Sequence, residues 1–462
     1  MALPPTTDTI AAIATAPGAG AVGVVRVSGP DAYAVADAVF RPASGARPSG
    51  VGPGRVLFGR VAARGEVVDQ ALLLTFKAPA SYTGQDVVEL QTHGGPAVLR
   101  RVLELCLEAG ARAAGPGEFT LRAYLNGKLD LAQAEAVLDL VNASTEAARR
   151  NAAGGLTGAL SRRIGEVQTD VTAAYAELQA GFDYPDEGVP EARLQEPLRR
   201  ALSRVDELLA TAEAGRLTRE GARLALLGRP NAGKSSLLNA LLGYQRSLVS
   251  DVPGTTRDYL EAPLVIGGVP VTLIDTAGIR AADDALEASG VVLTHEVAER
   301  ADLRLLVLDL SRPLDGEDRA LLARFAPHAP VERGGGRTHT VVVGSKADLP
   351  PTWARRDLGL HEGVPYVAVS AVSGAGLEEL RATLADQLVG DAAGAELWVG
   401  NDRHVEALKR ARASIAAALG HDEELAALDL QDALAALATI TGREGVVEET
   451  LASIFARFCV GK

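Results

Sequence analysis

One short motif restricts the fold of this chain more than any other feature. Residues 228–235 read Gly-Arg-Pro-Asn-Ala-Gly-Lys-Ser, which fits the P-loop pattern of two glycines and a Lys-Ser pair at fixed offsets. Residues 224–227 predict a buried strand before it, and residues 236–243 predict a helix that ends at Gly243. Such a loop surrounds phosphate oxygens with backbone N–H groups. The sequence therefore predicts a nucleoside triphosphate site, in which Lys234 reaches the terminal phosphates and the Ser235 hydroxyl binds magnesium.

The bulk composition is that of a globular protein. The chain has 462 residues, 47% hydrophobic and 23% charged, which suggests about three domains. The sequence contains no stretch of ~18 uncharged apolar residues, so no membrane span is expected. The N-terminus has no positively charged region followed by an apolar core, so no secretory signal is expected. The two cysteines, Cys106 and Cys459, lack metal-type spacing, so cytoplasmic localisation is the default expectation. A net charge of −13 argues against a nucleic-acid footprint over the whole chain, although local basic patches remain possible.

The sequence pattern changes three times along the chain. Residues 1–125 combine short strands with glycine turns and one amphipathic helix, which predicts an α+β N-terminal domain. Residues 126–220 and 389–462 read as two segments of an all-α helical domain, the first interrupted at Gly154-Gly155. Residues 221–388 alternate strands and helices, as in a parallel sheet. The predicted architecture is multidomain, with an α/β P-loop GTPase domain of the Ras-like type inserted into the helical domain.

Two segments after the P loop suit the phosphates and their metal. Residues 251–258 are polar and rich in turn formers, and could fold over phosphate with a threonine hydroxyl completing the magnesium shell. The strand at 271–275 ends in Asp275, which can hold the metal through water, and the Gly278 N–H can contact the terminal phosphate. Each segment alone is a weak signal, but their order and their position at strand ends make the set specific.

A third segment suits guanine. The strand at 340–344 is followed by Ser345-Lys346-Ala-Asp348, and a carboxylate at position 348 can accept hydrogen bonds from both N1–H and the exocyclic amine of guanine. Adenine offers no such pair of donors, so Asp348 favours guanine, and Ser370 and Ala371 could back the base. Ser345 stands where this kind of motif usually has asparagine, which should weaken the base pocket.

Hydrolysis needs a polar group that orients water. Ile279 follows Gly278 at the position where many GTPases have glutamine, and isoleucine cannot do this. Glu287 and Asn231 are the candidates that the sequence offers. From the residues alone, Glu287 could equally be a solvated acid at a helix start.

Over its whole length the chain resembles the tRNA-modification GTPases of the MnmE (TrmE) family. The motifs that carry the resemblance are the P loop with Ser236, Gly254-Thr-Thr-Arg-Asp258, Pro17-Gly-Ala-Gly-Ala-Val-Gly-Val-Val-Arg26, His93-Gly-Gly-Pro96, Pro116-Gly-Glu-Phe119, Asn126-Gly-Lys-Leu-Asp130 and the tail Phe458-Cys-Val-Gly-Lys462. Val460 stands where the family commonly has isoleucine.

The resemblance and the motifs together imply a nucleotide site. Its expected members are Asn231, Ala232, Gly233, Lys234, Ser235, Ser236, Ser250, Asp251, Val252, Pro253, Gly254, Thr255, Thr256, Asp275, Thr276, Ala277, Gly278, Ser345, Lys346, Asp348, Ser370 and Ala371. Ser235 and Thr256 are the expected Mg2+ ligands. The resemblance further implies a potassium ion (K+) bound by Asn231, Ser250, Val252 and Thr255. It also implies that Glu287 orients the water, that two G domains meet to trigger hydrolysis, and that the tail residue Cys459 is required for modification.

The resemblance also implies a folate site and partners. Arg26, Glu89, Lys128 and Lys462 match the positions that bind 5-formyl- or methylene-tetrahydrofolate in the N-terminal domain, which builds a homodimer. From its alternating strand alone, Glu89 would read as a solvent-facing acid. The implied reaction adds an aminomethyl or carboxymethylaminomethyl group to carbon 5 of the wobble uridine of certain tRNAs. The implied partner is an MnmG (GidA)-family flavoprotein, with which the chain forms a heterotetramer.

An alternative is a ribosome-assembly GTPase of the Era or Der type. It predicts a basic KH-like domain with a Gly-x-x-Gly loop, whereas the C-terminal segment here is helical and acidic to neutral.

Overall fold

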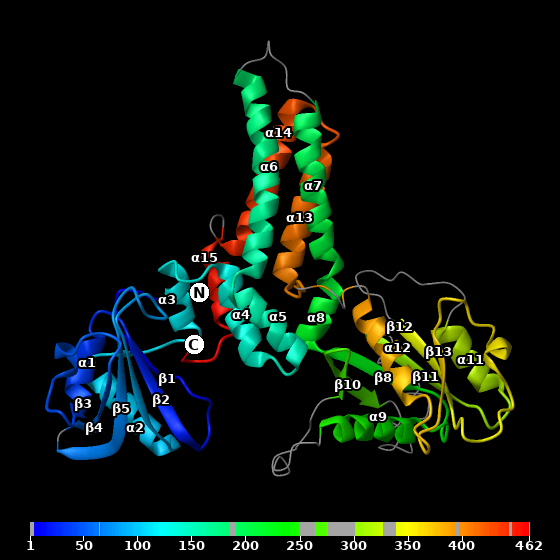
Figure 1. Ribbon diagram of the computed structural model, residues 1–462, viewed down its shortest axis with the longest axis horizontal. Coiled ribbons are helices and arrows are strands. Elements are labelled where there is room, and N and C mark those ends of the chain that lie inside the picture. The colour runs from blue at the N-terminus through cyan, green and yellow to red at the C-terminus, as the bar shows by residue number, and fades with distance from the viewer. Residues whose placement is uncertain are drawn as a thin grey trace. The chain divides into compact units, whose positions relative to one another are not determined.

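The structure is a computed structural model that describes most of the chain. It describes residues 4–63, 65–183, 191–249, 264–275, 301–326, 339–390, 392, 395, 397–442 and 446–461. The chain divides into two compact units. Figure 1 labels their helices and strands. Unit 1 consists of Met1–Leu138, Gly155–Gly165 and Leu434–Lys462, and unit 2 of Asp139–Gly154 and Glu166–Ala433. Each unit is described separately below.

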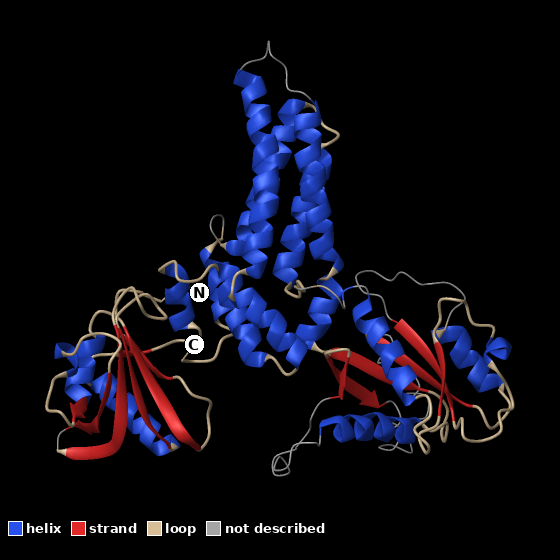
Figure 2. Ribbon diagram, viewed as in Figure 1, coloured by secondary structure: helices blue, strands red, loops and turns tan. Residues whose placement is uncertain are grey.

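A seven-stranded sheet organises the N-terminal part of unit 1 (Figure 2). Its strands are β1 (Ile10–Ile13), β2 (Gly20–Ser28), β3 (Phe40–Pro42), β4 (Val56–Ala63), β5 (Glu66–Phe76), β6 (Val87–Gly94) and β7 (Arg112–Ala113), in the order β3-β4-β5-β6-β2-β1-β7. All neighbouring pairs are antiparallel except β1 with β7. A short 3-10 helix, η1 (Pro48–Gly50), precedes β4.

Strand alternation gives this sheet two different faces. Leu73 is fully buried in an apolar cluster that it forms with residues of α1 (Ala32–Val39) and α2 (Pro96–Glu108). The neighbouring Leu72 is exposed. Successive side chains of a strand point to opposite faces, so both helices cover one face. The other face, called the open face below, is exposed at β4 and β5, whereas at β1 Ile10 and Ala12 are buried with Phe119. The open face also carries Arg26 and Glu89.

Helices complete unit 1. A second apolar cluster joins α3 (Glu118–Leu125), α4 (Leu131–Asn142) and α15 (Glu448–Phe455). The predicted interruption at Gly154-Gly155 is wrong, because both residues lie inside α5 (Glu146–Leu156). A Cβ at Gly155 would lie 3.0 Å from the Ala136 Cβ, so this glycine allows close helix packing. The chain turns instead at Gly158, whose φ is +79°.

Unit 2 contains a six-stranded sheet with helices on both faces. The strands are β8 (Ala222–Leu227), β9 (Leu264–Ile266), β10 (Val269–Asp275), β11 (Leu303–Asp309), β12 (His339–Ser345) and β13 (Tyr366–Val369), in the order β13-β12-β11-β8-β10-β9. All neighbouring pairs are parallel except β9 with β10. Leucines of α9 (Lys234–Val249) and α12 (Leu377–Val389) pack in one apolar cluster, and those of α11 (Gly316–Phe325) in another.

This arrangement is a doubly wound α/β fold. Ligands of such folds bind outside the carboxyl ends of the strands, where the strand order reverses. β8 lies at such a point, between β11 and β10. A 3-10 helix, η3 (Arg355–Leu358), follows β12. The predicted helix end at Gly243 is wrong, because α9 continues to Val249. A helical glycine costs only about 1 kcal/mol, and Gly243 does not adopt the positive φ that ends helices.

The helical part of unit 2 flanks this sheet in sequence. Its helices are α6 (Ala159–Asp183) from Glu166 onward, α7 (Glu191–Ala210), α8 (Ala212–Glu220), α13 (Asp402–Ala418) and the first part of α14 (Glu423–Thr441). Asp170 of α6 pairs with Arg200 and Arg204 of α7, and Asp206 of α7 pairs with Arg412 of α13. The predicted architecture is confirmed: an α+β N-terminal domain and an α/β domain inserted between two helical segments. Among the described helices, none combines the length and the apolar character that a bilayer span requires.

Candidate functional site

The P loop lies at the carboxyl end of β8, against β11. Gly228 has a φ of +141°, and a Cβ there would lie 2.3 Å from the Val307 carbonyl oxygen. Only glycine fits this approach. Asn231 and Gly233 also adopt positive φ, +61° and +93°. These turns bring the chain directly into α9, which begins at Lys234. The predicted order of strand, phosphate loop and helix is therefore present at the switch point of the sheet.

Lys234 is held inside this loop. Its Nζ donates hydrogen bonds to the carbonyl oxygens of Gly228 and Arg229, both at 2.8 Å, and the residue is only 9% exposed. Ser235 and Ser236 are exposed on the first turn of α9, and Asn231 is exposed on the loop. The loop thus combines a fixed ammonium group, accessible hydroxyls and a helix N-terminus, which together suit a phosphate and its metal.

The base-recognition loop follows β12. Lys346 adopts a φ of +60°, and Asp348 is exposed. The Ser370 hydroxyl donates a 2.6 Å hydrogen bond to Asp348 Oδ1, and the Ala347 N–H donates to the Val369 carbonyl at 3.1 Å. The structure therefore brings Asp348 and Ser370 together, and the buried serine orients one edge of the carboxylate.

Ser345 joins this loop to the P loop. Its Oγ lies 2.6 Å from the Ala232 carbonyl oxygen and 3.1 Å from that of Leu308 on β11. The residue is 5% exposed, so the hydroxyl is a buried tether rather than a solvent-facing group. Serine at this position therefore hydrogen-bonds to the phosphate loop.

Two of the residues predicted to bind folate form a cation–anion pair in the N-terminal sheet. Arg26 of β2 and Glu89 of β6 are register partners, and Arg26 Nε donates to Glu89 Oε1 at 2.8 Å. The guanidinium carbon lies 5.5 Å from the ring centre of Tyr82 and 5.6 Å from that of Phe119. Lys128 Nζ donates to the Pro79 carbonyl, in the same loop that carries Tyr82. Arg26 and Glu89 thus pair directly, and Lys128 contacts the loop whose Tyr82 lies against Arg26.

A buried ion-pair network supports this surface. Arg122 has no exposed area and donates to Asp8, Gln85 and Glu118. Glu118 also accepts from Arg112 at 2.6 Å and from the Gly115 N–H at 2.8 Å. Burial raises the pKa of Glu118, but these hydrogen bonds outweigh burial and hold the pKa below its ordinary value. Glu118 directly precedes Phe119, so the network fixes the ring beneath Arg26.

The C-terminal tail lies against Pro116 and Gly117, which directly precede Glu118. The Gly117 N–H donates to the Cys459 carbonyl at 3.4 Å, and Val460 forms an antiparallel bridge with Pro116. Cys459 is exposed. Cys106 is instead packed beneath the sheet in the apolar cluster, and burial raises the pKa of its thiol to about 12. Of the two cysteines, only Cys459 is placed for chemistry at a surface.

Comparison with known proteins shows which family this chain belongs to. A profile described as GTP-binding protein TrmE N-terminus matches residues 9–128, and one described as MnmE helical domain matches residues 131–459. A tRNA modification GTPase MnmE of Thermus thermophilus is 50% identical over 457 residues, which cover 98% of this chain and 99% of that protein. The chain belongs to the MnmE family of tRNA modification GTPases. It is therefore a GTPase that takes part in tRNA modification.

Further relatives agree. A tRNA modification GTPase MnmE of Chloroflexus aurantiacus is 44% identical over 464 residues, covering 98% of this chain and 100% of that protein. Among solved structures, the G domain of the T. maritima FeoB iron transporter covers 36% of this chain and 98% of that chain, at 28% identity and a TM-score of 0.26. A score this low adds nothing to the assignment. The alternative of an Era- or Der-type GTPase is wrong, since the family profile matches residues 131–459.

Several predicted site residues lie outside the described residues. They are Ser250, Asp251, Val252, Pro253, Gly254, Thr255, Thr256, Thr276, Ala277, Gly278, Glu287 and Lys462. Asp275 is described only as the last residue of β10. Their roles stay predictions.

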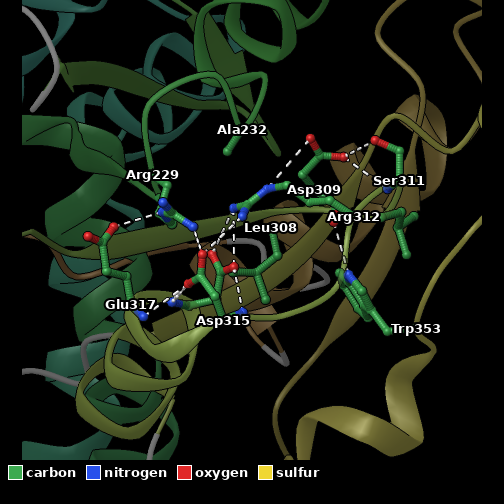
Figure 3. Close-up of polar contacts among 12 residues, drawn as sticks. Arg229, Ala232, Leu308, Asp309, Ser311, Arg312, Asp315, Glu317 and Trp353 are labelled. Carbon is green, nitrogen blue, oxygen red and sulfur yellow. Dashed lines mark hydrogen bonds and ion pairs between the residues drawn. The ribbon is translucent and has the colours of Figure 1, made fainter.

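Sequence reasoning missed two groups that support the nucleotide loops. Asp309, the last residue of β11, accepts a 2.6 Å hydrogen bond from Lys346 Nζ. Burial raises the Asp309 pKa, but Lys346 and Ser311 outweigh it, so the pKa lies below its ordinary value. Arg229 of the P loop pairs with acids of α11 (Figure 3). The sequence offered a signal for each: Asp309 is an acid at the end of a strand, and Arg229 is an arginine inside the P-loop motif.

Proposed function

We propose that this protein is a potassium-dependent, dimerisation-activated GTPase that works in tRNA wobble-uridine modification with an MnmG-type flavoprotein. The joint reaction adds an aminomethyl or carboxymethylaminomethyl group to carbon 5 of the uridine, with a one-carbon tetrahydrofolate as donor. The observation that carries the nucleotide half is that one sheet presents two prepared groups at the carboxyl ends of its strands: Lys234, held in the P loop after β8, and Asp348, oriented by Ser370 after β12. We further propose that the protein acts in the cytoplasm, where tRNA modification takes place.

The phosphate end of the site needs little rearrangement. Lys234 Nζ already faces the loop interior, so it can exchange its carbonyl partners for the β- and γ-phosphate oxygens of GTP. The exposed Ser235 hydroxyl suits Mg2+, a hard cation that prefers oxygen ligands, and Thr256 is its proposed companion. Bound Mg2+ would neutralise charge between the β- and γ-phosphates.

The base end selects guanine through Asp348. Ser370 occupies Oδ1 of its carboxylate, which fixes the orientation in which the group meets the base. Guanine places two donors on the edge that faces such a carboxylate, whereas adenine offers no such pair, so exchange for adenine would lose these two hydrogen bonds. We propose that Ser345 contributes through Ala232 of the P loop rather than through the base.

Potassium is proposed as the charge neutraliser of hydrolysis. Asn231 is exposed on the P loop in a left-handed conformation, so its amide oxygen is accessible to a cation near the phosphates. The other proposed ligands, Ser250, Val252 and Thr255, and the water-orienting Glu287, belong to segments outside the described residues. K+ would supply the positive charge that other GTPases obtain from an arginine.

The test compares GTP turnover in potassium and in sodium at equal ionic strength. We expect turnover at least about tenfold slower in sodium, since a missing charge neutraliser costs several kcal/mol. Asn231→Ala should reduce the potassium rate to the sodium rate, whereas Asn239→Ala, an exposed asparagine on α9, should not. Equal rates of the wild-type protein in both salts would reject the potassium mechanism.

The folate proposal rests on the chemistry around Arg26. Its guanidinium and the Glu89 carboxylate form a fixed charge pair above two aromatic rings, and Lys128 adds a cation nearby. Cations suit glutamyl carboxylates, a carboxylate suits the amine donors of a pterin, and ring faces suit the pterin itself. The folate would supply the one-carbon unit. Lys462 and Cys459 of the tail would complete this region.

Binding decides the folate assignment. Titration of 5-formyl-tetrahydrofolate should show wild-type binding and at least about tenfold weaker binding by Arg26→Ala, a loss of ~1.4 kcal/mol or more. Arg100→Ala on α2 is the matched control, because Arg100 is exposed on the covered side of the sheet. Equal binding by Arg26→Ala and wild type would reject the site.

The open face of the N-terminal sheet is the proposed homodimer surface. Phe58 and Leu72 are register partners on β4 and β5, and both are exposed, 57% and 39%. Val56 lies on the same strand at 60% exposure. Contiguous exposed apolar groups of this kind mark interaction surfaces. In sedimentation, Phe58→Glu should convert dimer to monomer, while Leu428→Glu on α14 should not; a monomeric wild type would contradict the proposal.

The tRNA partnership is proposed from the family and from charge. With a net charge of −13, and with Arg200, Arg204 and Arg412 paired to acids, we propose that the flavoprotein makes most tRNA contacts. Filter binding of tRNA to this chain alone at physiological salt should be weak, and the flavoprotein should restore it. Tight binding by this chain alone would refute this division of contacts.

A further inference from the structure

We propose that Arg229 is a positioning residue for guanine-nucleotide binding. It ties the P loop to the same ion-pair network that holds Lys346 of the base-recognition loop, so the phosphate and base loops share one support. The proposal rests on the nucleotide site proposed above. It adds a residue that touches neither phosphate nor base.

The side chain of Arg229 is directed away from the interior of the P loop. Figure 3 shows it reaching toward Asp315 and Glu317 in the first turn of α11. Its Nη1 pairs with Asp315 Oδ2, and its Nε lies 2.7 Å from Glu317 Oε2. Meanwhile its main-chain carbonyl accepts from Lys234 Nζ. One residue therefore connects the phosphate-binding lysine to a neighbouring helix.

The N-terminus of α11 is a rigid attachment point. Asp315 is the N-cap, and its Oδ1 accepts from the N–H groups of Glu317 and Asp318 at 3.0 and 3.1 Å. The Asp318 carboxylate accepts in return from the Asp315 N–H at 3.3 Å, and Asp318 is buried. Because Oδ1 serves the cap, Oδ2 of Asp315 remains for the arginines.

The network continues from α11 to the base loop. Arg312 pairs with Asp315 at 3.2 Å, with Asp318 at 3.1 Å and with Asp309 at 3.9 Å. Asp309 in turn binds Lys346 at 2.6 Å. Figure 3 shows Arg229, Asp315, Arg312 and Asp309 in this order of contacts. With Lys346 bound to Asp309, the charges alternate in sign along one chain of contacts.

Partial burial gives this network a measurable effect. The side chains of Arg229 and Arg312 are 28% and 32% exposed and that of Asp309 is 5% exposed, whereas those of Asp315 and Glu317 are 42% and 71% exposed. Water therefore screens the pairs of Arg229 more than the pair of Arg312 with Asp309, and each pair of Arg229 contributes modestly. Without Arg229, Asp315 and Glu317 lose a shared cation, and the P loop loses its attachment to α11. A looser loop must be ordered when the nucleotide binds, which lowers affinity.

The experiment uses the full chain and compares three variants. Arg229→Met retains the apolar stem and removes the charge, Arg229→Lys retains the charge, and Arg319→Met removes an exposed arginine elsewhere on α11. We expect Arg229→Met to weaken GDP binding about threefold to fivefold and to raise the KM for GTP by a similar factor, with kcat within about twofold. Arg229→Lys should recover part of the affinity, and Arg319→Met should match wild type.

A second arm guards against misfolding. Asp315→Asn retains a good N-cap and removes the charge, so it should weaken GDP binding without disturbing α11. If the two residues act as a pair, Arg229→Met combined with Asp315→Asn should weaken binding by less than the product of the single effects.

The experiment distinguishes failure of the positioning role of Arg229 from failure of the nucleotide site. If wild type binds GDP and both Arg229→Met and Asp315→Asn bind it equally well, the support role is overturned and the nucleotide site stands. A fall in kcat at unchanged KM would also overturn it, because Arg229 would then act on the chemistry. If wild type binds no GDP, the nucleotide site itself fails, and this proposal fails with it.

Discussion

Glu118→Gln tests the reasoning about the buried network most directly. Glu118 is 1% exposed and accepts four hydrogen bonds, two from Arg112 and one each from Arg122 and the Gly115 N–H. Glutamine removes the charge and turns an amide N–H₂ toward these donors. Breaking a buried pair on one side costs about 3–5 kcal/mol. Asp8 remains as a partner for both arginines, so we expect the lower figure, about 3 kcal/mol, in the N-terminal part of unit 1.

Hydrogen exchange followed by mass spectrometry measures this locally. A loss of about 3 kcal/mol should accelerate exchange of the slowest amides of β1 and β2 by roughly 150-fold. Both tryptophans, Trp353 and Trp398, lie in unit 2, so the fluorescence unfolding transition should not move. Local measurement is needed because a multidomain chain does not unfold in two states.

The matched control is Glu104→Gln on α2. Glu104 also faces an arginine, Arg101, at 3.4 Å, but its side chain is 50% exposed, so its pair should contribute under about 1 kcal/mol. If Glu118→Gln accelerates exchange no more than Glu104→Gln does, burial does not strengthen the network and the reasoning fails.

Three further predictions concern pH and the nucleotide. The pKa values of Asp8 and Glu118 are lowered in the folded protein, so the stabilisation by these carboxylates is complete above the ordinary carboxyl pKa of about 4 and is lost as pH falls through the folded pKa values. The difference in exchange rate between wild type and Glu118→Gln should therefore shrink below about pH 4. A constant difference down to about pH 2 would refute this. Lys234→Ala should weaken GTP binding about 100-fold in a filter or fluorescence titration, and near-normal GTP hydrolysis would contradict the site. Asp348→Asn should lower GDP affinity about 100-fold and raise that for xanthosine diphosphate, whose C2 carbonyl can accept from the amide; unchanged base preference in competition titrations would reject Asp348 as the base reader.

Local rules account for the parts of the fold that were predicted well. The phosphate loop, the strand before it and the helix after it follow from residue order within about a turn of chain. The errors at Gly243 and at Gly154-Gly155 have one cause. A glycine only permits a break, and whether the chain breaks depends on the surrounding packing, as the close approach of Gly155 to Ala136 illustrates.

Tertiary structure decided which charges meet. The chain carries 46 basic and 59 acidic residues, far too many possible pairs for sequence position to choose among. Arg122 and Asp8 are 114 residues apart, and Lys346 and Asp309 are 37 apart. The sequence by itself determined the kind of site, because backbone turns, hydroxyls and the phosphate-binding lysine lie within a few residues of one another. Only the folded chain could select Arg122, Asp309 and the α11 partners of Arg229, because burial and distance set the strength of an ion pair, and neither is a property of a linear sequence.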